Sequence, residues 1–531
     1  MPEELSDKVN GNLYQEKGIP DTRRDYMLEI MDTTLRDGEQ TEGVSFPKQE
    51  KLTLAKKLLQ LGIHRTEVAS AAKKQEFESV KAICDWAKTK GYLENIEVLA
   101  FVDKKSIDWA YKTGCKTVNL LCKGSLNHLK GQLGKTKEEH LADIKEVVQY
   151  AQSKGMDINV YLEDWSNGMI NSRNYVYFMI QGLRELNVKR IMLPDTLGIL
   201  SPGQVTEFIK ELKEKFPYKY DFHAHNDYGL ATANTMQAVL AGVDGIHVTA
   251  NKLGERTGNA SLFEVAVNLK DYYGIDLGLK ESKFQEVSDL VARLSGKRVP
   301  HNEPVVGENA RTQTAGIHAD GDKKAGLYVT KLTKPGRFGA DETRYALGKN
   351  VGKASIEMNL KELGIELTSE QIKTLRDEVA SLGHRKEQIT QADLLFLIAD
   401  LFEQPEMVPF KILDCEIKIS LNGERSAYVK ADYKGEILEA DAKGDGGYNA
   451  FWNAVKKMLE PKEIQIPKLV DYSITIPPGG QTSALTMASI GWEHNKKKLQ
   501  SKGVETDQHF AAVRATEKIL NLILRNGNSN H

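Results

Sequence analysis

Short runs of apolar and β-branched residues recur between about residues 28 and 250, each followed by a longer charged stretch with helical spacing. This alternation is typical of parallel βα units. The pattern predicts eight strands, which begin at Leu28, His64, Ile96, Lys116, Ile158, Arg190, Tyr220 and Gly245. Eight such units in a segment of this length predict a (β/α)8 TIM barrel. No GxGxxG follows the first strand, so a dinucleotide-binding sheet is not favoured.

The pattern changes twice after the barrel. Helical spacing dominates from about residue 281, interrupted by a glycine-rich stretch at 316–328 that we expect to be a loop. Strands alternate with two helices from about residue 411, which predicts a separate α+β domain. We therefore expect an N-terminal extension at 1–27, the barrel at 28–280, helical linker subdomains at 281–410 and a C-terminal domain at 411–531.

Composition narrows the functional classes. Lys and Arg number 72 and Asp and Glu 74, so no basic excess is present to neutralise nucleic acid or to hold an anionic membrane. The chain has no apolar run of about 18 residues, and its polar start lacks the apolar core of a secretion signal. The four cysteines form no CxxC pair. These features favour a cytoplasmic enzyme that acts on small molecules.

Polar residues gather where the predicted barrel strands end, which is the end that carries catalysis in this fold. Arg36 and Asp37 follow the first strand, and His223 and His225 alternate on the seventh, so that both imidazoles share one face. Asn259 follows the eighth strand and is a candidate fourth ligand. An HxH pair alone is more often two unrelated histidines, but three strand ends on one rim favour a metal site. Nitrogen and oxygen ligands without thiolate suit Mn²⁺, Mg²⁺, Zn²⁺ or Co²⁺.

Three further positions carry candidate chemistry, each with a structural alternative. Glu163 ends the fifth strand and is a base, a partner of the metal ligands or a surface carboxylate. Thr196 ends the sixth and either binds a substrate carboxylate or caps the next helix. A lone histidine is usually structural, but His318 has Asp320 and Tyr328 beside it in the predicted loop, which favours a functional loop.

Three separated motifs, DTTLRDGEQ, HAHNDYGLATAN and NKLGERTGN, occur in the order of the predicted strands. Together they resemble the isopropylmalate, homocitrate and citramalate synthase family, whose members condense acetyl-CoA with a 2-oxo acid. TQTAGIHADGDKK resembles the family's linker, and GDGGYNAF with IPPGGQTSAL resembles its C-terminal regulatory domain, so the resemblance extends from about residue 27. VLAFVD, NLLCKGS, NVYLEDWSNG and LPDTLGILSP look most like the citramalate branch, acyltransferases that use pyruvate.

The resemblance implies roles for the residues at the barrel mouth. A divalent metal on Asp37, His223 and His225 would chelate the 2-oxo acid as a Lewis acid. Arg36 would bind the substrate and stabilise the developing alkoxide.

Relatives also indicate which side chains meet the variable part of the 2-oxo acid, here Leu99, Leu121 and Tyr161. Three bulky side chains leave room for a methyl group, whereas an isopropyl group needs a smaller or more polar lining. One methylene changes discrimination by about 10- to 200-fold, so this lining gives a preference for pyruvate.

The family's base and regulation lead to further expectations. Glu163 and His318 are both candidates for the base that deprotonates acetyl-CoA. Relatives are domain-exchanged homodimers, so His318 and Tyr328 are expected to come from a second subunit. The regulatory domain would bind the end product, isoleucine, at walls formed by Asp445, Gly446, Tyr448 and the loop 477–480.

Other functions remain open at this level. An isopropylmalate synthase would share the whole metal site and make leucine precursors instead. A homocitrate synthase would need a basic residue in the pocket, and a lyase would lack the C-terminal domain. A catalytically silent amino-acid sensor is a more distant alternative. Lys252 and Gly326 depart from the family pattern, where glycine and asparagine are usual, and put acyl-CoA contacts or loop geometry in doubt.

Overall fold

The structure is a computed structural model that describes residues 28–71, 74–339, 344–384, 389–462, 464–476, 485–495 and 497–526. The predicted extension at 1–27 and the predicted regulatory loop at 477–480 lie outside these residues. The chain divides into two compact units, one reaching residue 310 and including 331–342, the other made of 311–330 and the residues from 343 onward. Among the described helices, none is both long and apolar enough to cross a membrane.

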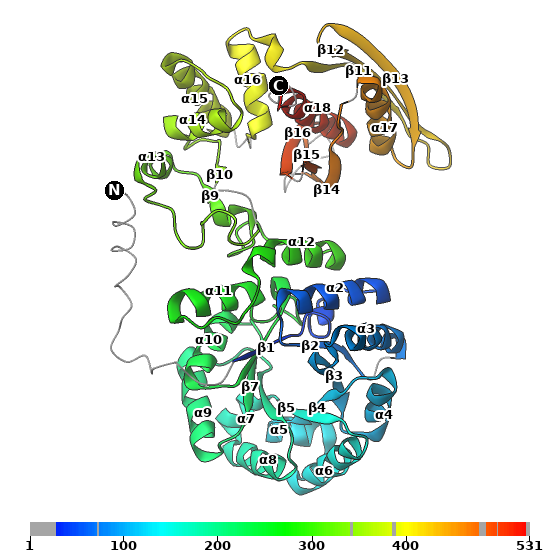
Figure 1. The fold of residues 1–531 in the computed structure, drawn as a ribbon, viewed down its shortest axis with the longest axis vertical. Helices are drawn as coiled ribbons and strands as arrows, with labels where there is room; N and C mark the ends of the chain where they lie inside the picture. Colours follow the sequence, from blue (N-terminus) through cyan, green and yellow to red (C-terminus); the bar gives the residue numbers. More distant parts are fainter. Residues whose placement is uncertain are drawn as a thin grey trace. The chain divides into compact units, whose positions relative to one another are not determined.

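The first unit contains a closed barrel in which each strand pairs in parallel with the next and β8 pairs with β1. All eight predicted strands are present, which confirms the (β/α)8 prediction. Figure 1 shows the ring that they form. The strands are β1 (Glu29–Asp32), β2 (Arg65–Ser70), β3 (Ile96–Phe101), β4 (Thr117–Lys123), β5 (Asp157–Glu163), β6 (Arg190–Asp195), β7 (Tyr220–Ala224) and β8 (Gly245–Val248).

Helices surround the ring of strands (Figure 1). Their apolar faces pack on the outer faces of the strands in one continuous core. Thr136 and Ser201 begin α6 and α9 with capping boxes, which pair otherwise unsatisfied backbone N–H groups. The helices around the ring are α2 (Lys48–Leu61), α3 (Phe77–Lys90), α4 (Lys104–Thr113), α5 (Leu126–His128), α6 (Lys137–Ser153), α7 (Trp165–Asn171), α8 (Arg173–Glu185), α9 (Pro202–Lys215), α10 (Ala231–Ala241) and α11 (Leu262–Tyr273), and α12 (Phe284–Ser295) packs on α2.

The barrel interior carries many polar side chains. Successive residues of a strand point to opposite faces, so one set packs against the helices and the other faces inward. The inward set includes ionic, amide and aromatic groups, all buried: Arg65, Glu67, Glu97, Asn119, Asn159, Tyr161, Arg190, Asp221, His223 and His247. The burial of this many charged groups requires that they pair with one another or hold an ion.

The second unit begins with helices and a short parallel pair, β9 (Thr312–Gln313) with β10 (Arg344–Tyr345). Its first helices are α13 (Gly316–Ala325), α14 (Lys353–Glu362), α15 (Ser369–His384) and α16 (Gln391–Leu401). The predicted glycine-rich loop at 316–328 is therefore wrong over the span of α13. Gly321 has a packing role there, since a Cβ at this position would lie 2.8 Å from the ring of Tyr328.

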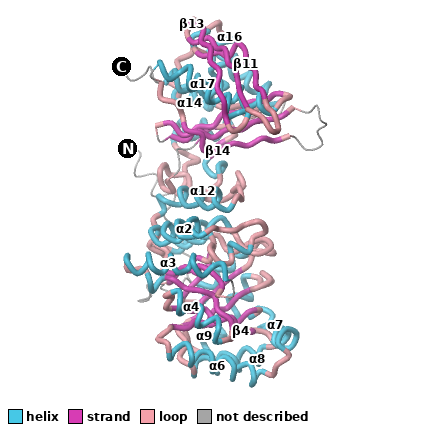
Figure 2. The backbone as a smooth tube through the Cα atoms, turned by 90° about the vertical axis from the view of Figure 1, so that its right-hand side faces the viewer, coloured by secondary structure: helices cyan, strands magenta, loops and turns pink. Residues whose placement is uncertain are grey.

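The rest of the second unit consists of two sheets of antiparallel strands, each followed by a helix. Helix α17 packs on the first sheet and α18 on the second, and Figure 2 shows α17 beside β11 and β13. This arrangement confirms the predicted α+β domain. The elements are β11 (Phe410–Lys418), β12 (Arg425–Tyr433), β13 (Glu436–Gly444), α17 (Gly447–Leu459), β14 (Lys468–Thr475), β15 (Thr486–His494), β16 (Lys497–Glu505) and α18 (Gln508–Asn526).

Candidate active site and metal centre

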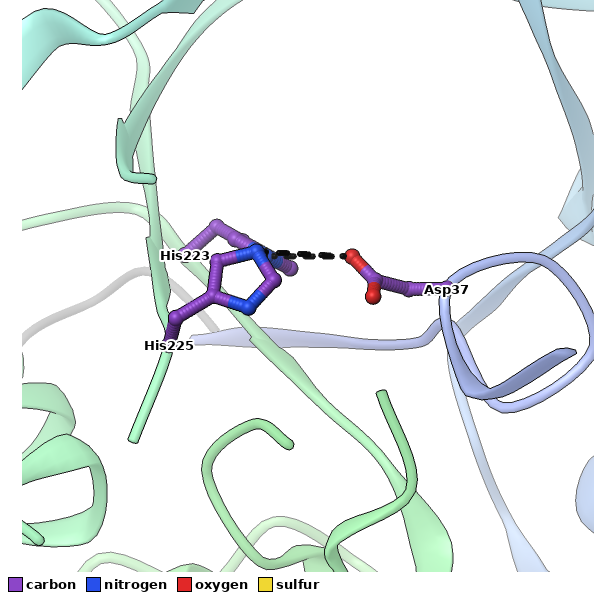
Figure 3. A group of neighbouring side chains, drawn as sticks. All are labelled: Asp37, His223 and His225. Atoms are coloured by element: carbon purple, nitrogen blue, oxygen red, sulfur yellow. Dashed lines mark hydrogen bonds and ion pairs between the residues drawn. The ribbon is translucent and has the colours of Figure 1, made fainter. Parts of the chain in front are cut away.

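Asp37, His223 and His225 converge at the carboxyl end of the barrel (Figure 3). Asp37 lies in the turn after β1, His223 lies on β7, and His225 follows that strand directly. Asp37 Oδ2 is 3.4 Å from His223 Nε2 and 3.8 Å from His225 Nε2, and the two Nε2 atoms are 3.3 Å apart. Among the described residues, this is the one cluster of three such groups close enough to hold a metal ion.

The surroundings of Asp37 and His225 favour the unprotonated form of both side chains. Burial opposes ionisation of Asp37, but the neighbouring Arg36, His223 and His225 outweigh it and hold the pKa of the carboxyl well below its usual value. Burial lowers the pKa of His225 to about 4, although the charge of Asp37 acts in the opposite direction. A carboxylate and a neutral imidazole are the forms that bind a metal cation.

The polar atoms around the cluster fit a divalent cation. Asn259 is joined to His225 by a β-bridge, and its amide nitrogen donates to Leu253 O at 3.1 Å. Its Oδ1 is buried and has no hydrogen-bond partner among the described residues. Because this amide oxygen remains an acceptor on a residue that pairs with His225, Asn259 stays a candidate for a further oxygen ligand.

Arg36 is held beside the metal cluster by a chain of hydrogen bonds. Its Nη1 donates to Asp37 Oδ2 at 3.0 Å, and its Nε donates to Glu67 Oε2 at 2.5 Å. Glu67 Oε1 accepts from Asn119 at 2.8 Å, and Asn119 Oδ1 accepts from Asn159 at 2.9 Å. The guanidinium is thus fixed in direction, with one side aimed at the carboxylate of the metal cluster.

An apolar cluster lies inside the barrel beside these groups, and it contains the predicted pocket residues Leu99, Leu121 and Tyr161 together with Met31 and Met192. Leu121, Tyr161 and Met192 are direct neighbours across β4, β5 and β6. The Tyr161 ring lies edge-on to the His223 ring, with centroids 6.3 Å apart. The structure thus places the three predicted residues in one patch next to the metal cluster.

Glu163 and Thr196 lie at the same end of the barrel with other partners. Glu163 is partly exposed and forms an ion pair with Lys123. The Thr196 hydroxyl accepts a hydrogen bond from the backbone N–H of Asp164 at 2.9 Å. The alternative of Thr196 as a helix cap is wrong, because Ser201 caps α9.

His318 and Tyr328 form a stacked pair in the second unit. Their ring centroids are 4.1 Å apart, and His318 Nδ1 lies 3.1 Å from the side-chain oxygen of Gln313. Asp320 pairs instead with Lys324 at 2.6 Å, so it does not join this pair. His318 on α13 and Tyr328 just beyond the end of this helix therefore lie together.

The predicted effector residues surround the start of α17. Gly446 is the N-cap residue of this helix, and the backbone N–H of Asp445 donates to the Asn449 side chain at 3.1 Å. The Tyr448 hydroxyl is 2.8 Å from that of Thr516, and its ring lies 5.0 Å from that of Tyr472. Burial raises the pKa of Tyr448. The side chain of Tyr448, which belongs to α17, therefore packs against β14 and α18.

The two departures from the family pattern have local explanations. Lys252 adopts a φ of 57°, a left-handed conformation for which glycine is favoured, and its Nζ lies 2.5 Å from Glu264 and 2.8 Å from Glu303. Gly326 ends α13 with a φ of 61°, which both glycine and asparagine tolerate. Neither position contributes a ligand atom to the metal cluster.

Sequence reasoning missed most of the groups that support the site. Glu67, Asn119, Asn159, Asp221 and His247 were not among the predicted site residues. The signal was present, because charged or amide residues occur at alternate positions of strands expected to be buried. Alternation from Arg65 to Glu67 on β2, for example, already directs both side chains inward.

A (β/α)8 barrel with a candidate metal centre at its carboxyl end, followed by an α+β domain, defines a class of metal-dependent enzymes. Three family models match successive parts of the chain: HMGL-like at residues 27–291, homocitrate synthase post-HMGL domain-like at 305–387, and LeuA allosteric (dimerisation) domain at 388–524.

Whole-chain relatives agree with these matches. The (R)-citramalate synthase of Methanocaldococcus jannaschii is 36% identical over 508 residues, covering 94% of this chain and 100% of that protein. The 2-isopropylmalate synthase of the same organism is 32% identical over 503 residues, covering 93% and 94%. The chain belongs to the citramalate and isopropylmalate synthase family and is an acyltransferase of this kind, which confirms the resemblance and disfavours a silent sensor.

Proposed function

We propose that the protein is an (R)-citramalate synthase, which condenses acetyl-CoA with pyruvate and water to give citramalate and CoA at the start of an isoleucine route. The observation that carries this proposal is the apolar patch beside the metal cluster. Leu121, Tyr161 and Met192 occupy adjacent inward positions, and Leu99 and Met31 complete the patch. Large side chains on neighbouring strands favour a small substituent on the 2-oxo acid.

The chain's own residues account for binding and charge stabilisation. A divalent cation held by Asp37, His223 and His225, with Asn259 as a further ligand, would supply Lewis acidity toward the keto group. Arg36 keeps a full positive charge, because the effect of Glu67 and the other neighbouring charges outweighs burial and raises its pKa. It would stabilise negative charge that develops on the keto oxygen. Thr196 is the proposed contact of the substrate carboxylate.

The reaction requires a base for the acetyl methyl group. That carbon loses a proton and bonds to the keto carbon, the keto oxygen gains a proton, and water cleaves the thioester to a carboxylate and the CoA thiol. In His318, Nδ1 faces the amide oxygen of Gln313 and therefore carries the hydrogen, which leaves Nε2 as the basic nitrogen. Glu163 is engaged by Lys123, which favours His318 over Glu163.

The second unit suggests assembly and regulation. The matched LeuA allosteric (dimerisation) domain supports a homodimer, in which His318 and Tyr328 would act on the partner's barrel. Isoleucine, as end product, is the proposed inhibitor, with Asp445, Gly446 and Tyr448 near its site. Millimolar isoleucine should lower the rate of CoA release, and an unchanged rate would contradict this part of the proposal.

The decisive test is CoA release from acetyl-CoA by protein loaded with Mn²⁺, with pyruvate and 2-oxoisovalerate compared at equal concentration. We expect kcat/KM for pyruvate to exceed that for 2-oxoisovalerate by at least about 10-fold. The reverse preference would make the protein a 2-isopropylmalate synthase of leucine biosynthesis. Sequence identity to relatives of both kinds, 36% and 32%, keeps that second function in view.

A further inference from the structure

A chain of hydrogen bonds runs from the pocket residue Tyr161 into the barrel. The Tyr161 hydroxyl lies 3.1 Å from His247 Nδ1, and His247 Nε2 lies 3.2 Å from Asp221 Oδ2. All three side chains are buried. This series of hydrogen bonds includes neither the proposed metal ligands nor the proposed base.

The partners of Asp221 fix the direction of these hydrogen bonds. Arg190 Nη1 donates to Asp221 Oδ1 at 2.8 Å, and Arg65 Nη2 donates to Oδ2. A carboxylate with an arginine at each oxygen is an acceptor, so His247 Nε2 must carry the hydrogen that it donates. In a neutral imidazole the other nitrogen, Nδ1, is then an acceptor, and the Tyr161 hydroxyl donates to it.

The backbone provides space for this carboxylate. Gly245 is the register partner of Asp221 on the neighbouring strand β8. A Cβ at Gly245 would lie 2.3 Å from Asp221 Oδ1, so any larger residue would displace the carboxylate. The position of Asp221, and through it the orientation of His247, is therefore specified by the fold.

The direction of the hydrogen bonds determines what Tyr161 presents to a substrate. Its hydroxyl donates to His247 in the barrel interior. Its ring packs edge-on against the rings of His223 and His247, at centroid distances of 6.3 and 5.5 Å. Tyr161 therefore offers the pocket a fixed aromatic wall and no hydrogen-bond donor. Such a wall limits the size of an apolar substituent and does not pair with a polar one.

We propose that His247 is a positioning residue that determines substrate size by holding the Tyr161 ring against the 2-oxo acid pocket. This inference rests on the proposed function, in that Tyr161 lines the pocket for the 2-oxo acid. Without the acceptor at Nδ1, the Tyr161 hydroxyl loses its buried partner and the ring can turn to find another. The pocket then accepts a substrate that is one methylene longer.

The test measures kcat/KM for pyruvate and for 2-oxobutyrate in the full-length Mn²⁺ enzyme. His247→Gln keeps a donor for Asp221 but has no acceptor at the Nδ1 position, and Tyr161→Phe removes the hydroxyl and keeps the ring. We expect each variant to lower the pyruvate to 2-oxobutyrate ratio about tenfold. The double variant should lower the ratio no further than the stronger single variant, because both remove the same hydrogen bond.

Two matched controls separate positioning from general stability. His64→Gln removes a histidine whose Nδ1 accepts from the backbone of Ile30, and Tyr220→Phe removes a hydroxyl that donates to Phe216 O, both away from the pocket. Both controls should keep the ratio of the starting protein. Mn²⁺ affinity, measured by calorimetric titration, should stay within about threefold in every variant, because no metal ligand is changed.

The outcomes distinguish this inference from the proposed function. An unchanged ratio in Tyr161→Phe would overturn the role of His247, and so would effects of the single variants that multiply in the double variant. If His247→Gln does not fold, the Tyr161→Phe result alone decides. A starting protein that prefers 2-oxoisovalerate to pyruvate would instead overturn the proposed substrate. The coupling of His247 to Tyr161 would still be visible as a shift in the ratio.

Discussion

Two clusters of buried polar side chains lie inside the same barrel, and they are balanced in different ways. In the first, Arg65 and Arg190 both pair with Asp221, Arg65 also pairs with Glu97 at 3.2 Å, and both arginines contact Glu29 at 2.9 and 2.8 Å. Positive and negative groups alternate in this arginine cluster. Desolvation is offset by direct ion pairs, so the cluster is complete without a ligand.

The second cluster, at the carboxyl end, has a surplus of acceptors. Asp37, His223 and His225 direct a carboxylate oxygen and two imidazole nitrogens at one another, and Asn259 adds an unpaired amide oxygen. Arg36 is the neighbouring positive group, and it is shared with Glu67. The comparison shows how the candidate metal site differs from a structural ion-pair cluster within one barrel: each carboxylate of the arginine cluster contacts an arginine, whereas in the metal cluster two imidazole nitrogens and a carboxylate oxygen face one another.

The largest expected effect follows from changing the charge of the acceptor-rich cluster. Asp37→Asn removes the carboxylate ligand while it keeps the shape of the side chain. We expect Mn²⁺ binding to weaken and kcat/KM to fall by at least about 10³-fold, since Lewis acid catalysis contributes several kcal/mol. Calorimetric titration and CoA release measure the two effects, with Asp276→Asn on the exposed surface as control. Full metal binding and turnover in Asp37→Asn would remove this cluster from catalysis.

A substitution in the arginine cluster should instead lower the stability of the folded protein. Arg65→Met leaves Asp221 and Glu97 buried with less compensation, which should lower the free energy of unfolding by about 3–5 kcal/mol. Denaturant unfolding of the Mn²⁺-free protein measures the loss, and Arg293→Met on the exposed face of α12 is the control. If the clusters are independent, Mn²⁺ should stabilise Arg65→Met by the same amount as the starting protein. A smaller increment would show that the arginine cluster also shapes the metal site.

Glu67 tests the connection between Arg36 and the barrel interior. Glu67→Gln keeps the hydrogen bond to Asn119 possible but removes the charge that holds Arg36 at 2.5 Å. We expect kcat to fall about 10- to 100-fold, with Mn²⁺ affinity nearly unchanged, because the orientation of a supporting group is lost and the ligands are kept. Steady-state kinetics with calorimetry separates the two. A drop in metal affinity as large as the drop in kcat would place Glu67 with the ligands.

The sequence predicted the parts of the site that depend on strand ends. Asp37, His223 and His225 follow or end predicted strands, and the carboxyl ends of parallel strands meet on one rim. Their convergence in the structure agrees with that reasoning. The grouping of Leu99, Leu121 and Tyr161 was also accessible, although by resemblance to relatives rather than by periodicity.

The missed parts depend on contacts between distant strands. The hydrogen bond from Tyr161 to His247 joins β5 to β8 across the interior, and the ion pair of Arg65 with Asp221 joins β2 to β7. Such pairs require the register and curvature of the closed barrel, which hydrophobic periodicity does not contain. Helix α13 was missed for a local reason, because glycines are typical of a loop. One of its glycines, Gly321, makes room for the ring of Tyr328, a contact that the sequence alone does not reveal.

The smallest expected effect concerns a buried histidine outside both clusters. His140 Nε2 accepts from the backbone N–H of Lys123 at 3.1 Å, and burial lowers the pKa of His140 from 6.5 to about 4. Between these pH values the unfolded chain binds a proton that the folded chain does not, so the free energy of unfolding falls as the pH is lowered. His140→Gln removes this titration and should reduce the acid-induced loss by about 2 kcal/mol. Denaturant unfolding at pH 7 and pH 4.5 measures the difference, with His301→Gln at an exposed position as control. If His140→Gln loses as much unfolding free energy between these pH values as the starting protein, the acid sensitivity belongs to other groups.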